Sequence, residues 1–295
     1  MTRRILPALL LVVAVALGSG CIVRKLRVSR KGTAPNTKLA TASLDELLRR
    51  ITLLDQQIHT INASVNIEPS TGTVNKGEIS EYTNVPGFIL IRKPDMFRMI
   101  GMAPVARNRI FDMVTDGESF KIFFPTKGRL FIGKNKIDHP SPKKIENIRP
   151  QHVYDAIVVH PLAPSERAVL ENRTDEAEAS YIVHVLAGRG VNLKLDRNLW
   201  FERVGLHLSR QVLFDEHGDI ITDARYDDYK IVDGIEFPHS INITRPIDEY
   251  GIKLTVTKLE LNGEIRDDQF VLTTPEGTEV TDLSRPQPAA RGVKH

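Results

Sequence analysis

The densest group of potential metal ligands in this 295-residue sequence is the segment DEHGD at residues 215–219. Its polar side chains could converge on one cation: Asp215, Glu216, His217 and Asp219. Acids and a glycine in such a run are also what a tight turn between two strands requires, and we favour that explanation. The nine histidines are otherwise scattered, without an HxxxH pair or partner cysteines. We therefore expect no metal and no cofactor.

Residue patterns for nucleotide binding and nucleophilic catalysis are missing from the sequence as well. Gly188-Arg189-Gly190 lacks the glycine spacing and the following helix of a phosphate-binding loop. No Gly-x-Ser-x-Gly elbow occurs. The acids on either side of Arg225 indicate a solvated ion-pair face. These observations predict that the protein is not an enzyme.

The amino end has the composition of a secretory signal and is followed directly by the only cysteine. Arg3 and Arg4 precede the apolar run Ile5–Leu17, and small residues fill positions 18–20. The run is too short for a comfortable membrane span. A lone cysteine cannot form an internal disulfide, and a free thiol is unusual in an oxidising compartment. We predict a lipoprotein signal peptide at residues 1–20 and lipidation of Cys21.

The arrangement around Cys21 resembles a bacterial lipobox. The leucine that usually stands three residues before the cysteine is four before it, at Leu17, with Gly18 in its place. An unlipidated signal peptide with an incidental cysteine is the alternative. Residue 22 is Ile rather than Asp, so the resemblance implies attachment at the periplasmic face of the outer membrane.

Positive charge is concentrated at the two ends of the chain. Residues 21–42 form the predicted tether, with no acid and these basic residues: Arg24, Lys25, Arg27, Arg30, Lys31 and Lys38. This composition is typical of a flexible linker; its charge either suits an anionic membrane surface or is incidental. Residues 284–295 form a basic tail that we expect to be disordered. The remaining domain, residues 43–283, is net acidic, so nucleic acid is not an expected partner.

One strong amphipathic helix is expected at the start of the domain. Ser43 and Glu46 have the spacing of a capping box. Apolar residues then follow the helical period as far as about His59 and form one stripe: Leu44, Leu47, Leu48, Ile51, Leu54 and Ile58. The helix is either an ordinary core helix or a lid over a cavity, and the periodicity is compatible with both.

The rest of the domain consists of short alternating apolar runs separated by turn residues, a pattern that indicates β-strands. The runs within Gly87–Phe124 are apolar on both faces, so this part of the sheet needs cover on two sides. A polar surface loop is expected at 133–147 and a short helix at 150–160. Parallel βαβ units are absent, so we predict a mainly β fold with one strongly curved or nearly closed antiparallel sheet. The expected strands lie near residues 61–67, 78–84, 87–92, 96–102, 109–115, 119–124, 129–132, 181–187, 199–208, 211–214, 220–229, 235–244 and 250–261.

Three segments resemble the LolA/LolB family of periplasmic lipoprotein carriers and acceptors, in the family's order. They are ILIRKPDMFRM at residues 89–99, DMVTDG at 112–117 followed by FFP at 123–125, and DQFVLTTPEGTEV at 268–280. The helix–strand opening at 43–68 fits as well, so the resemblance spans nearly all of residues 43–283. It implies an incomplete β-barrel with an N-terminal lid helix and a small helical insert. Its concave side would hold acyl chains by apolar contact, without a catalytic group.

The resemblance also implies which residues bind the acyl chains. The expected cavity wall consists of Ile89, Ile91, Phe97, Met99, Phe111, Met113, Phe120, Ile122 and Phe124. The expected lid residues are Leu44, Leu47, Leu48, Ile51 and Leu54. The alternative is that the same side chains fill a dry core under the helix.

Two departures from the family bear on the lid and on chain length. Family carriers have an arginine before the proline that is thought to latch the lid, whereas this chain has Lys93. Lysine lacks the forked donors of a guanidinium, and Arg92 should point to the opposite face of its strand. The chain is also longer than typical carriers of the family, with extra sequence near residues 133–179.

The sequence thus predicts a lipid-anchored, LolB-like protein that binds acyl chains of lipoproteins or lipids for outer-membrane localisation. Anchorage through Cys21 argues for an acceptor or resident role, since a shuttle must leave the membrane. A periplasmic carrier protein is a further expected partner. The alternative is a resident outer-membrane lipoprotein that uses the same fold as a sensor or assembly scaffold for another envelope protein.

Overall fold

The computed structural model describes residues 38–73, 78–81, 84–137, 141, 144–174 and 178–284. From Leu39 onwards these residues belong to one compact unit. Cys21, the signal peptide, nearly all of the tether and the tail after Ser284 lie outside the described residues. In the part that is described, no helix is long and apolar enough to cross a membrane.

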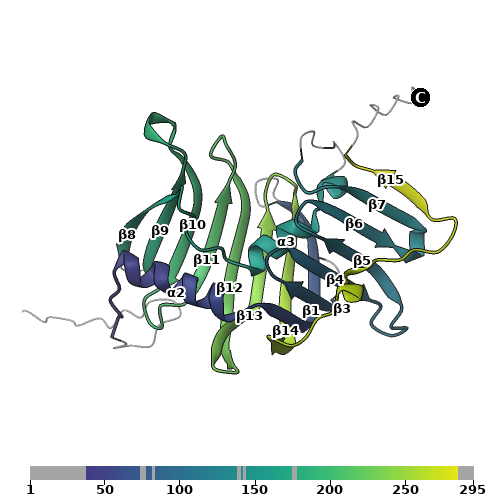
Figure 1. The fold of residues 1–295 in the computed structure, drawn as a ribbon, viewed down its shortest axis with the longest axis horizontal. Helices are drawn as coiled ribbons and strands as arrows, with labels where there is room; N and C mark the ends of the chain where they lie inside the picture. Colours follow the sequence, from purple (N-terminus) through teal and green to yellow (C-terminus); the bar gives the residue numbers. More distant parts are fainter. Residues whose placement is uncertain are drawn as a thin grey trace, which may run out of the picture. The chain divides into compact units, whose positions relative to one another are not determined.

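A single curved sheet of fifteen strands carries the fold (Figure 1). The strands follow the order β15-β7-β6-β5-β4-β3-β1-β14-β13-β12-β11-β10-β9-β8, with β2 paired to β1 off this path. Because β15 and β8 end the path without pairing to each other, the sheet stays open, which confirms the predicted mainly β, incomplete barrel. Among the described strands, β15 and β7 form a parallel pair, so the sheet is mixed rather than purely antiparallel. The strands are β1 Thr60–Thr73, β2 Glu78–Glu81, β3 Val85–Arg92, β4 Met96–Met102, β5 Arg109–Thr115, β6 Ser119–Phe124, β7 Arg129–Lys134, β8 Arg167–Thr174, β9 Ala179–Ala187, β10 Lys194–Glu202, β11 Leu208–Phe214, β12 Ile220–Val232, β13 Ile235–Arg245, β14 Tyr250–Leu261 and β15 Glu279–Asp282.

Two of these strands, β8 and β15, have no counterpart among the sequence predictions. Both lie at an edge of the sheet, where a strand pairs on one side only. In β8 most side chains are exposed and only every second residue near its start is half-buried. Edge strands are often polar, so they carry a weak apolar alternation that sequence patterns miss.

The expected strand at 199–208 is in fact interrupted by a turn after Glu202. The Glu202 carboxylate accepts hydrogen bonds from the backbone N–H groups of Val204, Gly205 and His207 at 2.5, 2.8 and 3.1 Å. Leu206 adopts a left-handed conformation with φ 59°. One acidic side chain therefore replaces the hydrogen bonds that a continuing strand would make, and the prediction was wrong at this point.

Helix α2 spans Leu44–Gln57 and begins with the predicted capping box. The Ser43 hydroxyl accepts from the Glu46 N–H at 3.3 Å, and the Glu46 carboxylate accepts from the Ser43 N–H at 2.7 Å. The helix ends two residues earlier than expected because Asn262 caps it: its amide group donates to the Gln57 carbonyl and accepts from the His59 N–H, both at 2.8 Å.

The second helix, α3, spans Pro150–Ile157 and covers the face of the sheet formed by the first strands. It starts with proline at its first turn, as expected from the fixed φ of that residue. Val153, Tyr154 and Ala156 are buried against β4, β5, β12 and β13. Tyr226 of β12 donates a hydrogen bond to the Ala156 carbonyl at 2.8 Å. This contact and the apolar packing fix α3 across the middle of the sheet (Figure 1).

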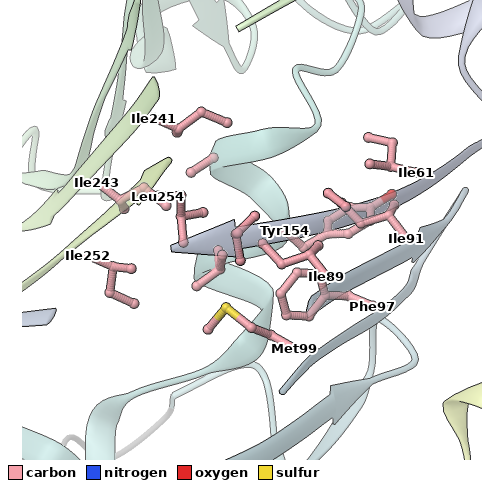
Figure 2. Packing of buried hydrophobic residues seen from close by; sticks show 14 of the residues in the cluster. Ile61, Ile89, Ile91, Phe97, Met99, Tyr154, Ile241, Ile243, Ile252 and Leu254 are labelled. Atoms are coloured by element: carbon pink, nitrogen blue, oxygen red, sulfur yellow. The ribbon is translucent and has the colours of Figure 1, made fainter. Parts of the chain in front are cut away.

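The predicted need for cover on both faces of Gly87–Phe124 is confirmed. On one face, Phe97 and Met99 of β4 point toward Tyr154 of α3 together with Ile89 and Ile91 of β3 (Figure 2). On the other face, Val114 and Phe123 form a separate cluster with three residues of the segment that follows β14: Ile265, Phe270 and Leu272. Two different parts of the chain therefore bury the two faces of the same strands.

A buried ion pair attaches the segment at 265–272, which we call the closing segment, to the second face of β4 and β5. Arg98 of β4 donates from Nε and Nη2 to the two carboxylate oxygens of Asp112 at 2.9 and 2.7 Å. Its Nη1 donates to the Gln269 carbonyl at 2.6 Å. Arg109 also donates to Asp112 at 2.9 Å. The guanidinium of Arg98 thus joins two strands and the segment at 265–272 in one charged network.

The segment at 133–147, expected to be a polar surface loop, is in part buried. Asn147 at the end of this segment, and Arg149 two residues later, have exposed fractions of only 2% and 3%. Arg149 donates to the carbonyls of Lys134, Glu146 and Ile148, and its guanidinium lies over the Phe120 ring at 4.5 Å from the ring centre. The loop is therefore tied to the core by one arginine, a long-range contact that local polarity does not reveal.

His152 on α3 makes the stability of this region depend on pH. Burial, and then the charges of Arg245 and Arg149, hold the pKa of His152 well below its ordinary value. The neutral ring can accept from the Tyr250 hydroxyl, which lies 2.8 Å from Nδ1; Asp248 is the nearby acid, paired with Arg245 at 2.7 Å.

Because the unfolded chain takes up the proton first, His152 contributes its full stability above about pH 6.5 and loses it as the pH falls. We expect the free energy of unfolding to fall by at most about 1.4 kcal/mol per pH unit below that point. Urea unfolding of the wild type and the His152→Gln variant between pH 7.5 and 4.5 measures the difference. Equal slopes for the two proteins would contradict the assignment.

Candidate functional site: an apolar cleft under helix α2

An apolar cleft with a volume of about 380 Å³ lies between α2 and the ends of β10–β13. Its volume is at the lower end of the range of about 300–1,000 Å³ that is usual for small-molecule sites. The cleft has polar residues among its lining as well: Arg50, Gln57, His207 and Glu236. Its apolar lining consists of Ile51, Leu53 and Leu54 from α2, Val159 after α3, and Phe201, Leu206, Leu208, Tyr229, Ile231 and Ile235 from the sheet.

The cleft lies at the junction of two hydrophobic clusters on the same face of the sheet. The first cluster contains Phe97 and Met99 under α3, and the second contains Leu47 and Ile51 of α2 against β9 and β10. Val159 and Leu208 are the lining residues that pack against both. An apolar ligand in the cleft would therefore bury surface against two cores at once.

A polar cluster forms the rim of the cleft at the ends of the strands. The His207 ring stacks on the Tyr229 ring with 4.6 Å between centres. Its two nitrogens lie 3.1 Å from Glu202 and 3.2 Å from Glu236. Burial, then the charges of these two acids, raises the pKa of the Tyr229 hydroxyl, so the hydroxyl stays protonated and donates to the Leu208 carbonyl at 2.7 Å. These contacts fix the positions of the side chains at the rim. No set of side chains among the described residues has the geometry of a metal site.

Lys93 fastens the end of α2 beside the cleft. Its ammonium group donates to the backbone carbonyl of Asp55, and to the Asp55 carboxylate at 2.7 Å. Both side chains are largely shielded from solvent, at 15% and 28% exposed. Arg92 points to the other face, as expected, where it pairs with Asp267 at 2.6 Å. The chain thus holds the end of its helix with a lysine.

Replacing Lys93 by methionine should loosen the end of α2. Hydrogen bonds to charged groups contribute about 1.5–3 kcal/mol, so amide exchange over residues 54–58 should accelerate by about tenfold or more. Hydrogen–deuterium exchange read by mass spectrometry measures this. Lys121→Met, on the exposed surface of β6, is the matched control and should leave α2 unchanged. Unaltered exchange of α2 in Lys93→Met would show that the pair does not hold the helix.

The residues predicted as the cavity wall are brought together, but away from the cleft. They belong to the first cluster: Ile89, Ile91, Phe97, Met99, Met113, Phe120 and Ile122 are buried, and Phe111 and Phe124 are partly buried against them. Register explains their common face, since Ile89 pairs with Met99 and Met99 with Met113. They pack under α3 rather than under α2.

The residues predicted as the lid divide between the two clusters. Leu47 and Ile51 are buried in the second, with Leu44 and Leu48 packed against it, whereas Leu54 packs against the first. Of the five, Ile51 and Leu54 line the cleft. The prediction that the helix has one apolar stripe facing the sheet agrees with this arrangement. Most of the stripe lies over β9 and β10, and of the five residues only Leu54 packs against the cluster that contains the predicted wall.

Sequence reasoning did not identify the sheet side of the cleft. Ile231 and Ile235 flank the turn Asp233-Gly234, and the sequence patterns considered above assign no site to apolar residues at a hairpin tip. Ile231 is 70% exposed. Large apolar residues beside an exposed turn were the signal available, because such positions are usually polar.

The arrangement of strands and helices is found in solved structures. A LolA superfamily protein from Nitrosomonas europaea matches with a TM-score of 0.50 over 79% of this chain and 99% of that chain, at 13% identity. The present chain has a LolA-like fold. A DUF1329 family protein from Desulfovibrio piger matches with a TM-score of 0.53, covering 76% of this chain and 94% of that chain at 12% identity. No protein-family model and no curated protein matches the chain.

These likenesses rest on structure and not on sequence. The LolA-like fold agrees with the resemblance of the segments at 89–99, 112–125 and 268–280. In this chain helix α2 borders the apolar cleft.

Proposed function

We propose that the protein is a lipid-anchored envelope protein that binds an acyl chain of a lipoprotein or lipid in the cleft under α2, for outer-membrane localisation. The observation that carries the proposal is an apolar cleft bordered by the amphipathic helix of a LolA-like fold. Contact with apolar surface is worth about 0.8 kcal/mol per buried methylene and needs no catalytic group. The role proposed is therefore binding rather than catalysis.

The cleft borders the hydrophobic cluster to which the predicted wall residues belong. Leu54, Tyr229 and Ile235 line the cleft and also pack against the cluster that contains Phe97. We propose that the acyl chain enters at the α2 end and lies against this cluster. The size of the cleft fits one chain rather than several. Lipidation of Cys21 would keep the protein at the outer membrane, where it would receive cargo from a periplasmic carrier.

A scaffold role for another envelope protein is the second candidate, and the open edge of β8 favours it. Within the described sheet, β8 pairs with β9 alone, so its other edge offers free backbone groups to a partner strand. Val169 on this strand is 53% exposed. A partner could add a strand here without entering the cleft.

The acyl-binding proposal is tested with a Cys21→Ser chain purified from the periplasm and analysed by native mass spectrometry. We expect co-purifying lipid, or uptake of an added fatty acid or lipopeptide. Leu54→Asp should weaken this binding by at least about tenfold, since it removes apolar contact worth about 1.5–3 kcal/mol and adds a charge. Val169→Asp on β8 is the matched control.

Circular dichroism shows whether the Leu54→Asp variant remains folded. A lipid-free wild type that takes up neither fatty acid nor lipopeptide would rule out the acyl-binding role. In that case a protein that is captured by a partner through β8, and released by Val169→Asp, would support the scaffold role.

A further inference from the structure

Large apolar side chains are exposed together at one end of the sheet. Leu53 on α2, Val204 in the β10–β11 turn and Ile231 near the end of β12 have exposed fractions of 47%, 49% and 70%. The β10–β11 and β12–β13 turns leave the same end because these strands are successive antiparallel neighbours. The His207–Glu236 contact at 3.2 Å joins the two turns. We name Leu53, Val204 and Ile231 the mouth patch.

The mouth patch borders the opening of the cleft. Leu53 and Ile231 both line the cleft while remaining exposed, and Val204 lies two residues before the lining residue Leu206. Single exposed apolar residues are ordinary on protein surfaces, but a group around the opening of an apolar cleft marks an interaction site.

The chain that precedes the domain joins it at this same end. Ala40 donates from its backbone N–H to the Arg203 carbonyl at 2.7 Å, and Arg203 Nε donates back to the Ala40 carbonyl at 3.0 Å. Arg203 is the neighbour of Val204 in the turn. The basic segment at 21–42 therefore connects to the domain next to the mouth patch, whatever path its earlier residues take.

Basic side chains lie on the α2 side of this end: Arg50 lines the cleft and Arg49 is exposed on α2. The turn side carries two acids, Glu202 and Glu236, which both lie against His207. The segment at 21–42, which joins the domain here at Ala40, contains six basic residues and no acid. Basic residues next to apolar ones are the combination that binds membranes containing anionic lipids.

We propose that the mouth patch docks on a phospholipid bilayer, so that the cleft opens directly into the lipid. The proposal rests on the proposed acyl-binding function. Leu53, Val204 and Ile231 enter the interfacial layer, and the basic residues contact lipid headgroups. An acyl chain then passes between bilayer and cleft without crossing water, where its exposed methylenes would be unfavourable. A second copy of the chain or another protein on the patch is the competing occupant.

Site-specific fluorescence tests the docking in the full chain. In a Cys21→Ser background, Ile231→Cys and Val191→Cys each provide one position for an environment-sensitive dye. Val191 is 99% exposed and lies in the β9–β10 connection, at the opposite end of the strands from Ile231. Vesicles contain phosphatidylethanolamine and phosphatidylglycerol, with or without nitroxide-labelled lipid.

We expect the dye at position 231 to shift to the blue on vesicles and to be quenched by the nitroxide lipid, while the dye at 191 stays unchanged. An unchanged dye at 231 on vesicle-bound protein would overturn the proposal. So would equal responses at the two positions. A shift at 231 without vesicles, accompanied by a doubled mass in solution, would assign the patch to a second copy and overturn it as well.

Val204→Asp separates docking from acyl binding, because Val204 does not line the cleft. Its vesicle-bound fraction should fall by at least about fivefold relative to the Val191→Asp control, since it replaces an inserted apolar group by an acid. Its uptake of fatty acid in solution should equal that of the wild type. If the wild type takes up no fatty acid but the dye at 231 still enters the bilayer, the proposed function fails and docking stands. If the wild type takes up fatty acid but the dye at 231 does not enter the bilayer, docking is rejected and the proposed function stands.

Discussion

Replacing Asp112 by alanine is expected to lower the free energy of unfolding by about 3–5 kcal/mol, because it leaves a buried arginine without its counter-charge. Asp112 is 1% exposed and accepts from Arg98 through both oxygens, and from Arg109. The remaining contacts of Arg98 to backbone carbonyls do not replace a carboxylate. Urea unfolding monitored by circular dichroism measures the loss.

The control for Asp112→Ala is Asp268→Ala, which removes an exposed ion pair with Arg266 in the same closing segment. Exposed pairs contribute little, so this variant should unfold close to the wild type. Hydrogen exchange should also show the segment at 265–272 released in Asp112→Ala. A loss of less than about 1 kcal/mol in Asp112→Ala would contradict the account of this network as the attachment of the second face.

Phe97→Ala is expected to lower the free energy of unfolding by about 3–5 kcal/mol, the range for removing an aromatic side chain from a filled core. Phe97 is fully buried and lies edge-on to Tyr154 with 6.5 Å between ring centres (Figure 2). Phe88→Ala on the adjacent strand, where the side chain is 45% exposed, is the matched control and should have a small effect.

The Phe97 result distinguishes the two interpretations of the predicted wall. In a dry core, the alanine variant loses stability and its acyl binding changes only as far as the fold loosens. If Phe97 lined an open cavity, truncation would cost little stability and would alter acyl affinity directly. A loss of unfolding free energy below about 1.5 kcal/mol, together with changed fatty-acid uptake, would therefore show that the acyl site lies toward α3 rather than in the α2 cleft.

Much of the fold followed from local patterns. The capping box of Ser43 and Glu46 fixed the start of α2, and alternation placed Phe97 and Met99 on one face with Ile89 and Ile91. These features depend on neighbours within a few residues, which a sequence displays directly. The LolA-like fold itself was indicated by the order of three short segments.

The position of the site could not be derived in the same way. The apolar stripe of α2 fits any apolar surface, so periodicity did not decide between the strands under α3 and those at β9 and β10. The turn after Glu202 depends on one carboxylate folding back on three N–H groups. Lys93 reaches Asp55 across 38 positions of sequence. Contacts of this kind are set by tertiary packing, which local propensity does not encode.

Photo-crosslinking with a fatty acid that carries a diazirine near the end of its chain tests the central claim most directly. After irradiation of the wild type, peptide mapping by mass spectrometry locates the attached lipid. The account predicts adducts in α2 around Leu54 and in the strands around Leu208 and Ile235, lost in Leu54→Asp and kept in Val169→Asp. Adducts confined to residues outside the cleft, or no saturable adducts at all, would contradict acyl binding under α2.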